Sequence, residues 1–67
     1  MTNAKLLRQK IKASELSSTA VAAAQGWSMP TYYHSISGKR ECKATEIMTF
    51  VRLLRLTREE RDAIFFS

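Results

Sequence analysis

Apolar residues recur along the chain at the spacing of α-helices, and no stretch shows the alternation typical of a strand. The clearest apolar stripe lies between about residues 44 and 54 and predicts a helix with one face on the core. Its members follow one another at i, i+3, i+4 and i+7: Ile47, Phe50, Val51 and Leu54. Near the start of the chain, Leu7 and Ile11 lie one helical turn apart and predict a first helix that ends at about Ala13.

The stretch from residue 17 to residue 36 predicts two short helices separated by a turn. Ser17 and Ser28 each stand where a side-chain oxygen can accept from a backbone N–H of the first helical turn. Gly26 can adopt the left-handed backbone conformation that a short turn requires. Pro30 falls in the first turn of the second helix, where its missing N–H leaves no hydrogen bond unmade.

The side chains around this turn predict that the two helices cross closely. Ala22 and Ala23 are small enough to let the second helix lie against the first. An apolar pair flanks each serine cap at the spacing of a hydrophobic staple, which fixes the angle at which the chain begins the helix. These pairs are Leu16 with Val21 and Trp27 with Tyr32. A close pair of helices joined by a tight turn is the helix-turn-helix arrangement.

Two further elements follow this pair. A polar loop from Ser37 to Glu41 contains Gly38, which predicts the end of the preceding helix. Thr57 and Glu60 have the spacing of a capping box and predict the start of a last helix, which carries Phe65 and Phe66 at its end. Adjacent helical residues point in different directions, so we expect one phenylalanine on the core and the other on a groove or a second subunit.

Together these elements predict an all-α fold: a compact five-helix bundle that contains a helix-turn-helix. With 67 residues the chain has room for one core, so we expect residues 1–67 to form a single domain.

The order of elements resembles the phage Cro and lambda-repressor family of DNA-binding proteins. The resemblance rests on Ser17 to Ile36 and on Leu56 to Phe66, and it covers nearly the whole chain. It implies a bundle of the lambda-repressor-like type whose second motif helix, about Met29 to Ile36, lies in the major groove. Two residues depart from the family's pattern: Gln25 replaces an aliphatic core residue, and Lys43 replaces the usual Thr or Ser cap.

The resemblance also implies which residues contact bases. Met29, Pro30 and His34 match positions that usually read bases, and Thr31 is the other residue of the outer face able to hydrogen bond to a base edge. Met and Pro offer only apolar contacts, for example with a thymine methyl, where the family usually has Gln, Arg, Lys, Asn or Ser. For His34, an exposed residue with no role in binding is the alternative.

Phosphate contacts are implied in the same way. Ser18 and the backbone at Ser28 match contacts made at helix N-termini. Lys39 and Arg40 belong to the loop that approaches the phosphate backbone in the family. Tyr33 is a further candidate for a phosphate contact, and an aromatic ring packed on its own helix is the alternative.

The net charge of +5 is unevenly distributed. Up to Arg40 the chain has six Lys and Arg side chains and a single acidic one, Glu15, whereas the remainder has five of each sign. The whole positive excess therefore lies in the part that carries the motif. A DNA-facing surface requires this, since phosphate neutralisation dominates affinity. A merely solvated basic face is the alternative.

Other classes of function find little support. There is no paired acid and base, no nucleophile beside His34, no phosphate-binding glycine loop and no metal-ligand spacing, so we expect neither an enzyme nor a metal or cofactor. The single Cys42 is expected as an apolar plug and fits a reducing cytosol. The longest apolar run, residues 20–24, is too short to cross a membrane. We expect a cytoplasmic protein of a bacterial or phage-infected cell, without membrane contact.

A domain of this size contacts few base pairs, so a specific site normally needs two copies. We therefore expect a homodimer on double-stranded DNA, in contact through apolar residues that the core does not require. These are Met48, Leu53, Phe65 and Phe66. The sequence thus predicts a sequence-specific transcriptional regulator that represses by occupying its operator. The alternative is a protein-interaction module of the same fold, binding a repressor or polymerase component through Met29, Pro30 and Tyr33.

Overall fold

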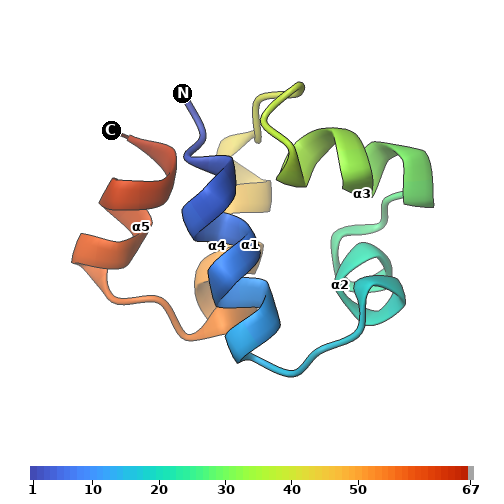
Figure 1. The fold of residues 1–67 in the computed structure, drawn as a ribbon, viewed down its shortest axis with the longest axis horizontal. Helices are drawn as coiled ribbons and strands as arrows, with labels where there is room; N and C mark the ends of the chain where they lie inside the picture. Colours follow the sequence, from blue (N-terminus) through green and yellow to red (C-terminus); the bar gives the residue numbers. More distant parts are fainter. Residues whose placement is uncertain (67) are drawn as a thin grey trace.

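All five predicted helices are present in the computed structural model, which describes residues 1–66 (Figure 1). They are α1 (Ala4–Ala13), α2 (Ser18–Gln25), α3 (Met29–Ile36), α4 (Ala44–Leu54) and α5 (Arg58–Phe65). Residues 1–66 contain no strand, and their Cα radius of gyration is 10.5 Å. The prediction of an all-α, five-helix bundle is confirmed.

The central helices of the bundle are α1 and α4. In Figure 1, α1 crosses in front of α4, with α5 on one side and the α2–α3 pair on the other. Helix α1 contacts both α5 and α3, while α4 contacts α2 and α5. The α2–α3 pair is thereby held against both the helix that precedes it and the helix that follows it in the chain.

One side chain from each helix forms the centre of the core. Leu7, Val21, Phe50 and Ile64 have no exposed surface, and Tyr32 of α3 retains only 3%. The predicted stripe on α4 faces this centre, with Phe50 enclosed and the other three members partly buried against the core. The helical periodicity in the sequence therefore identified the inner face of α4.

Side-chain caps begin four of the helices. Each cap oxygen accepts from the backbone N–H three residues on, at 3.0–3.4 Å. The capping residues are Asn3, Ser17, Ser28 and Thr57. Helix α4 lacks a side-chain acceptor at its cap because the Lys43 ammonium only donates; instead the Glu46 carboxylate accepts from the Lys43 backbone N–H at 2.8 Å.

The turn between α2 and α3 has the predicted glycine geometry. Gly26 is left-handed at φ +74°, and the N–H of Trp27 donates to the Ala22 carbonyl at 2.9 Å. Ala22 is buried, as its predicted role in close helix crossing requires. Ala23 is exposed, so the same expectation was wrong for that residue, which lies on the solvent side of α2.

The two adjacent phenylalanines separate as predicted. Phe65 is 5% exposed and its ring stacks on that of Phe50, with centroids 5.8 Å apart. Phe66 is 62% exposed. Phe65 is therefore part of the core, and Phe66 is the one of the two that retains surface for a contact with a second subunit.

Candidate nucleic-acid interface

Helix α3 presents one side to the core and the other to solvent. Tyr32, Ser35 and Ile36 are buried, which confirms the inward orientation predicted for Tyr32 and Ile36. The exposed side follows the spacing i, i+3, i+4 and i+7. Its members are Pro30, Tyr33, His34 and Ser37, which we call the outer face of α3.

The four residues expected at base edges lie at the start and along the outside of α3. Pro30 and His34 are exposed, and no hydrogen bond involves the His34 imidazole within residues 1–66. Met29 is half-buried and packs against the core. Thr31 is half-buried too, and its hydroxyl lies 3.0 Å from that of Ser28. The structure thus leaves all four with some exposed surface, and Pro30 and His34 with the most.

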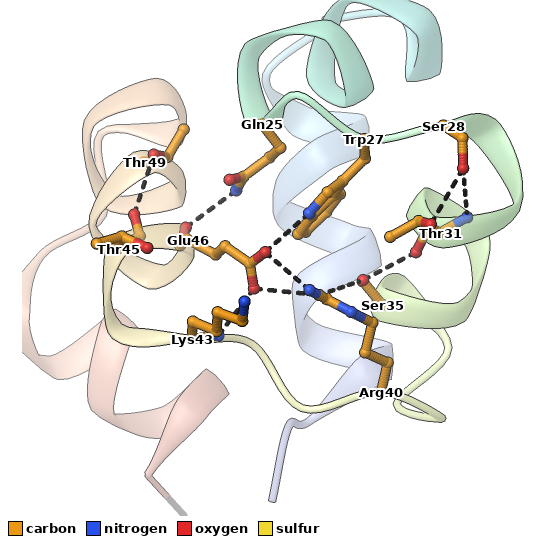
Figure 2. Close-up of polar contacts among 10 residues, drawn as sticks. All are labelled: Gln25, Trp27, Ser28, Thr31, Ser35, Arg40, Lys43, Thr45, Glu46 and Thr49. Atoms are coloured by element: carbon orange, nitrogen blue, oxygen red, sulfur yellow. Dashed lines mark hydrogen bonds and ion pairs between the residues drawn. The ribbon is translucent and has the colours of Figure 1, made fainter.

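A network around one carboxylate joins α3, the following loop and α4 (Figure 2). Arg40 donates through Nη1 and Nη2 to both oxygens of Glu46, at 3.1 and 2.8 Å. The same carboxylate accepts from Trp27 Nε1 at 2.9 Å and from the Lys43 backbone N–H. Arg40 Nη1 also donates to the buried Ser35 hydroxyl at 3.1 Å. We call these five residues the Glu46 network.

The hydrogen bonds from Arg40 dominate the electrostatics of this network. Together with those from Lys43 and Trp27 they outweigh burial and lower the pKa of Glu46 to about 2. The same pair raises the pKa of Arg40. Since the Glu46 side chain is only 13% exposed, water screens this interaction weakly. Glu46 is therefore ionised at any pH at which the protein would function.

Arg40 occupies a position different from the one expected for a phosphate contact. Its side chain is 30% exposed, its guanidinium pairs with Glu46, and it lies over the Trp27 ring at 5.2 Å from the centroid. Lys39, the other loop cation, is exposed, and its backbone N–H donates to the His34 carbonyl at 3.0 Å. The loop therefore closes on the last turn of α3 with Lys39 outward and Arg40 inward.

Glu46 was missed as a site residue, although its position in the sequence predicts a capping contact. Glu46 stands three residues after the α4 cap, where a capping-box glutamate accepts from the cap N–H. The two departures from the family's pattern meet at this residue. Lys43 leaves its capping role to Glu46, and Gln25 Nε2 donates to the Glu46 backbone carbonyl at 2.9 Å. The amide thus ties the helix-turn-helix to α4 by a polar contact.

Basic residues of α1 beside α3 were also missed as site residues. Arg8 and Lys12 are exposed and line a shallow groove of about 180 Å³ between α1 and α3, with Tyr32 and Ile36 in its floor. Arg8 Nη1 lies 3.4 Å from the Ile36 carbonyl. Neither Arg8 nor Lys12 forms an ion pair within the described chain. Their helical spacing in the sequence placed them on one face, but not next to α3.

Lys10, unlike Arg8 and Lys12, forms an ion pair with another helix. It forms an ion pair with Glu60 and so connects α1 to α5, on the side away from the groove. The hydrogen bond from Lys10 lowers the pKa of Glu60. The cations of α1 thus divide into one that joins helices and others that face solvent next to α3.

A second exposed surface lies where α4 begins and α5 ends. Met48 and Phe66 are 60% and 62% exposed and line the same hollow of about 340 Å³, together with the half-buried Cys42. Leu53 is partly buried against the core. Of the residues expected at a dimer contact, Met48 and Phe66 retain most of their surface.

Cys42 has the environment of an apolar side chain. It packs against the core, and burial raises the pKa of its thiol to about 11. The thiol is therefore protonated and unreactive at neutral pH. Within residues 1–66 no three His, Cys, Asp or Glu side chains lie close enough to hold a metal ion. No helix of the described chain has the length and hydropathy needed to cross a membrane.

Comparison with known proteins agrees with this geometry. A family model described as a helix-turn-helix domain matches residues 4–64, which include α1 to α4 and all of α5 except its last residue. No curated protein and no solved structure was found to match. Helix-turn-helix domains bind DNA and are typically not enzymes, so the match supports a DNA-binding regulator in general terms.

Proposed function

Because residues 4–64 place the chain in the helix-turn-helix domain family, we propose that it is a sequence-specific transcriptional regulator of the phage Cro and repressor type. In this proposal α3 enters the major groove of double-stranded DNA, and occupancy of the operator blocks transcription in the cytoplasm of a bacterial or phage-infected cell. The main support for the proposal is the exposed outer face of α3. Beside it lie Arg8 and Lys12, which form no ion pair within the described residues.

The proposed phosphate contacts lie on both sides of α3. Lys39 follows its last turn, and Arg8 and Lys12 lie along α1 next to it. Ser18 and Ser28 stand at the starts of α2 and α3, where backbone N–H groups attract anions. Arg40 takes a supporting role here, since its guanidinium is engaged by Glu46.

The proposed assembly is a homodimer. Two copies would place two α3 helices on half-sites about one turn, roughly 34 Å, apart. Met48 and Phe66 offer the exposed apolar surface for this contact, and Leu53, which is partly buried against the core, is a further candidate.

The salt dependence of DNA binding tests this proposal. Each phosphate contact contributes about 0.9 to the slope of log K against log salt concentration, so we expect Arg8→Ala with Lys12→Ala to lower that slope by about 2 on every sequence. The matched control is Arg52→Ala with Arg58→Ala, which removes the same charge from exposed positions on α4 and α5. Fluorescence anisotropy with duplexes selected from a random pool gives both slopes.

Two results would contradict the proposal. One is equal loss of binding in the test and control variants, which would mean that only net charge matters. The other is the absence of duplex binding at low salt. In that case capture of a protein partner through Pro30 and Tyr33, with little salt dependence, would replace DNA recognition as the function.

A further inference from the structure

The serine and threonine hydroxyl groups of α3 and its two caps are engaged in local hydrogen bonds. Ser28 Oγ accepts from the Thr31 N–H and lies 3.0 Å from Thr31 Oγ1. Ser35 Oγ donates to the Thr31 carbonyl at 2.8 Å, and Ser37 Oγ donates to the His34 carbonyl at 3.1 Å. These four hydroxyls already have partners, which reduces what they can offer to base edges.

Helix α3 also lacks the side chains that make strong base contacts. Residues 29–36 contain no Arg, Lys, Asn, Gln, Asp or Glu, so no bidentate pair with guanine or adenine can form from this helix. The His34 imidazole is the one ring on the outer face with nitrogen atoms to offer. Among the exposed side chains of residues 29–36, the His34 imidazole and the Tyr33 hydroxyl are therefore the groups left for hydrogen bonds to DNA.

What remains exposed on the outer face is mainly carbon. Pro30 is exposed, and Tyr33 is 54% exposed. The Tyr33 ring meets the buried Tyr32 ring edge to face, with centroids 5.2 Å apart and planes at 69°. The Tyr33 ring is thus packed against a core side chain while more than half of the residue remains exposed as a largely apolar surface.

The major groove has one apolar group that such a surface can recognise, the 5-methyl group of thymine. We infer that α3 reads its site mainly through thymine methyl groups that contact Pro30 and the ring of Tyr33. The inference rests on the proposed function and adds the chemical feature of the DNA that is recognised. A contact of the Tyr33 hydroxyl with phosphate remains compatible with it, because the hydroxyl lies at the far end of the ring.

Replacing thymine by uracil tests the inference, because deoxyuridine differs from thymidine only in lacking that methyl group. A duplex selected from a random pool is resynthesised with deoxyuridine at one thymine at a time, and Kd is measured for each. Burial of one methyl corresponds to about a four-fold change in Kd, so we expect a loss of about this size at each contacted thymine. An unchanged Kd at every position would overturn the inference while leaving the regulator proposal standing.

Variants of Tyr33 separate methyl recognition from other effects. We expect Tyr33→Phe to keep the difference between thymine and uracil, and Tyr33→Ala to reduce it. His34→Ala, also on the outer face, serves as the control and should keep the difference. If Tyr33→Ala retains the full difference, the ring is not the reader and the inference fails. If no duplex is enriched or bound at all, the proposed function fails and the inference with it.

Discussion

At the scale of single residues, Glu46 joins three segments around α3 through one carboxylate. Its carboxylate accepts hydrogen bonds from the turn, the loop and the α4 cap, and Ser35 of α3 is joined to it through Arg40. A carboxylate with charged and neutral donors on several sides is stabilised in its ionised form. One ionisable group therefore connects α4 to the turn before α3 and to the loop after it.

We expect Glu46→Gln to lower the free energy of unfolding by about 2 kcal/mol at neutral pH, since the amide keeps the shape but loses the charge that Arg40 requires. Glu59→Gln is the control, because Glu59 is exposed and forms no ion pair within the described residues. Urea unfolding followed by circular dichroism measures both. Equal stability of Glu46→Gln and the unmodified protein would show that the network contributes no net stability.

The same carboxylate predicts an acid dependence. The pKa of Glu46 is about 2 in the folded protein against an ordinary value of 4.5, so its contribution is complete above about pH 4.5 and is lost as the pH falls toward 2. We expect the difference in unfolding free energy between the unmodified protein and Glu46→Gln to shrink over this range. A difference that stays constant from pH 6 to pH 3 would assign the effect to packing instead.

At the scale of elements, the C-terminal end of α2 has the glycine cap that is usual for a left-handed residue, whereas that of α4 does not. Helix α2 ends at a left-handed glycine, as the sequence predicts. Helix α4 ends at Arg55, which has φ +52° and so adopts the left-handed conformation with a side chain present. For a residue with a Cβ this conformation is strained. The left-handed backbone is therefore strained at Arg55 but not at Gly26, although the two residues have similar φ angles.

We expect Arg55→Gly to raise the free energy of unfolding by roughly 0.5–1 kcal/mol, the relief of strain being partly offset by the greater freedom of glycine in the unfolded chain. Gly26→Ala is the reciprocal change and should lower it by about 1 kcal/mol, because an added Cβ meets no atom within 4 Å and only the backbone is strained. Thermal unfolding of both variants decides the point. A destabilised Arg55→Gly would mean that the Arg55 side chain supplies a contact worth more than the strain.

The elements themselves were largely predictable, and the contacts between them were not. Caps, glycine stops and helical periodicity are local signals, so they placed Ser17, Ser28, Gly26 and Thr57 correctly. The interaction of Trp27 with Glu46 spans 19 residues and has no local signature. The packing of Arg8 and Lys12 beside α3 likewise depends on the position of α1 in the bundle. Sequence reasoning thus described the helices and the outer face of α3, but it did not predict that Arg40 pairs with Glu46 or that Arg40 also contacts Ser35 of α3.

At the scale of the whole molecule, opposite ends of the bundle carry different surfaces. Helix α3 lies on one side of the bundle and α5 on the other (Figure 1). The groove with Arg8 and Lys12 is lined by residues of α1 and α3. The Asn3 N–H donates to the Ile64 carbonyl, so the first and last helices are joined on the α5 side. The Met48 and Phe66 surface is separate from the outer face of α3. Both surfaces could therefore be used at once by a dimer bound to DNA.

We expect Phe66→Ser to weaken self-association, since an exposed aromatic side chain at an interface contributes much of its affinity. Tyr33→Ser is the control, because Tyr33 is similarly exposed but lies on α3. Sedimentation of the DNA-free proteins over a range of concentrations compares them. If both variants sediment as the unmodified protein does, the surface at Met48 and Phe66 is not the dimer contact.

The chain has a single tryptophan, and its indole lies inside the Glu46 network, hydrogen bonded to the carboxylate and covered by the Arg40 guanidinium. Its ultraviolet emission is consequently an intrinsic optical reporter of the contacts between the turn before α3, the loop after it and α4. Acid titration, duplex addition and substitution can all be followed through that one chromophore, with no dye attached.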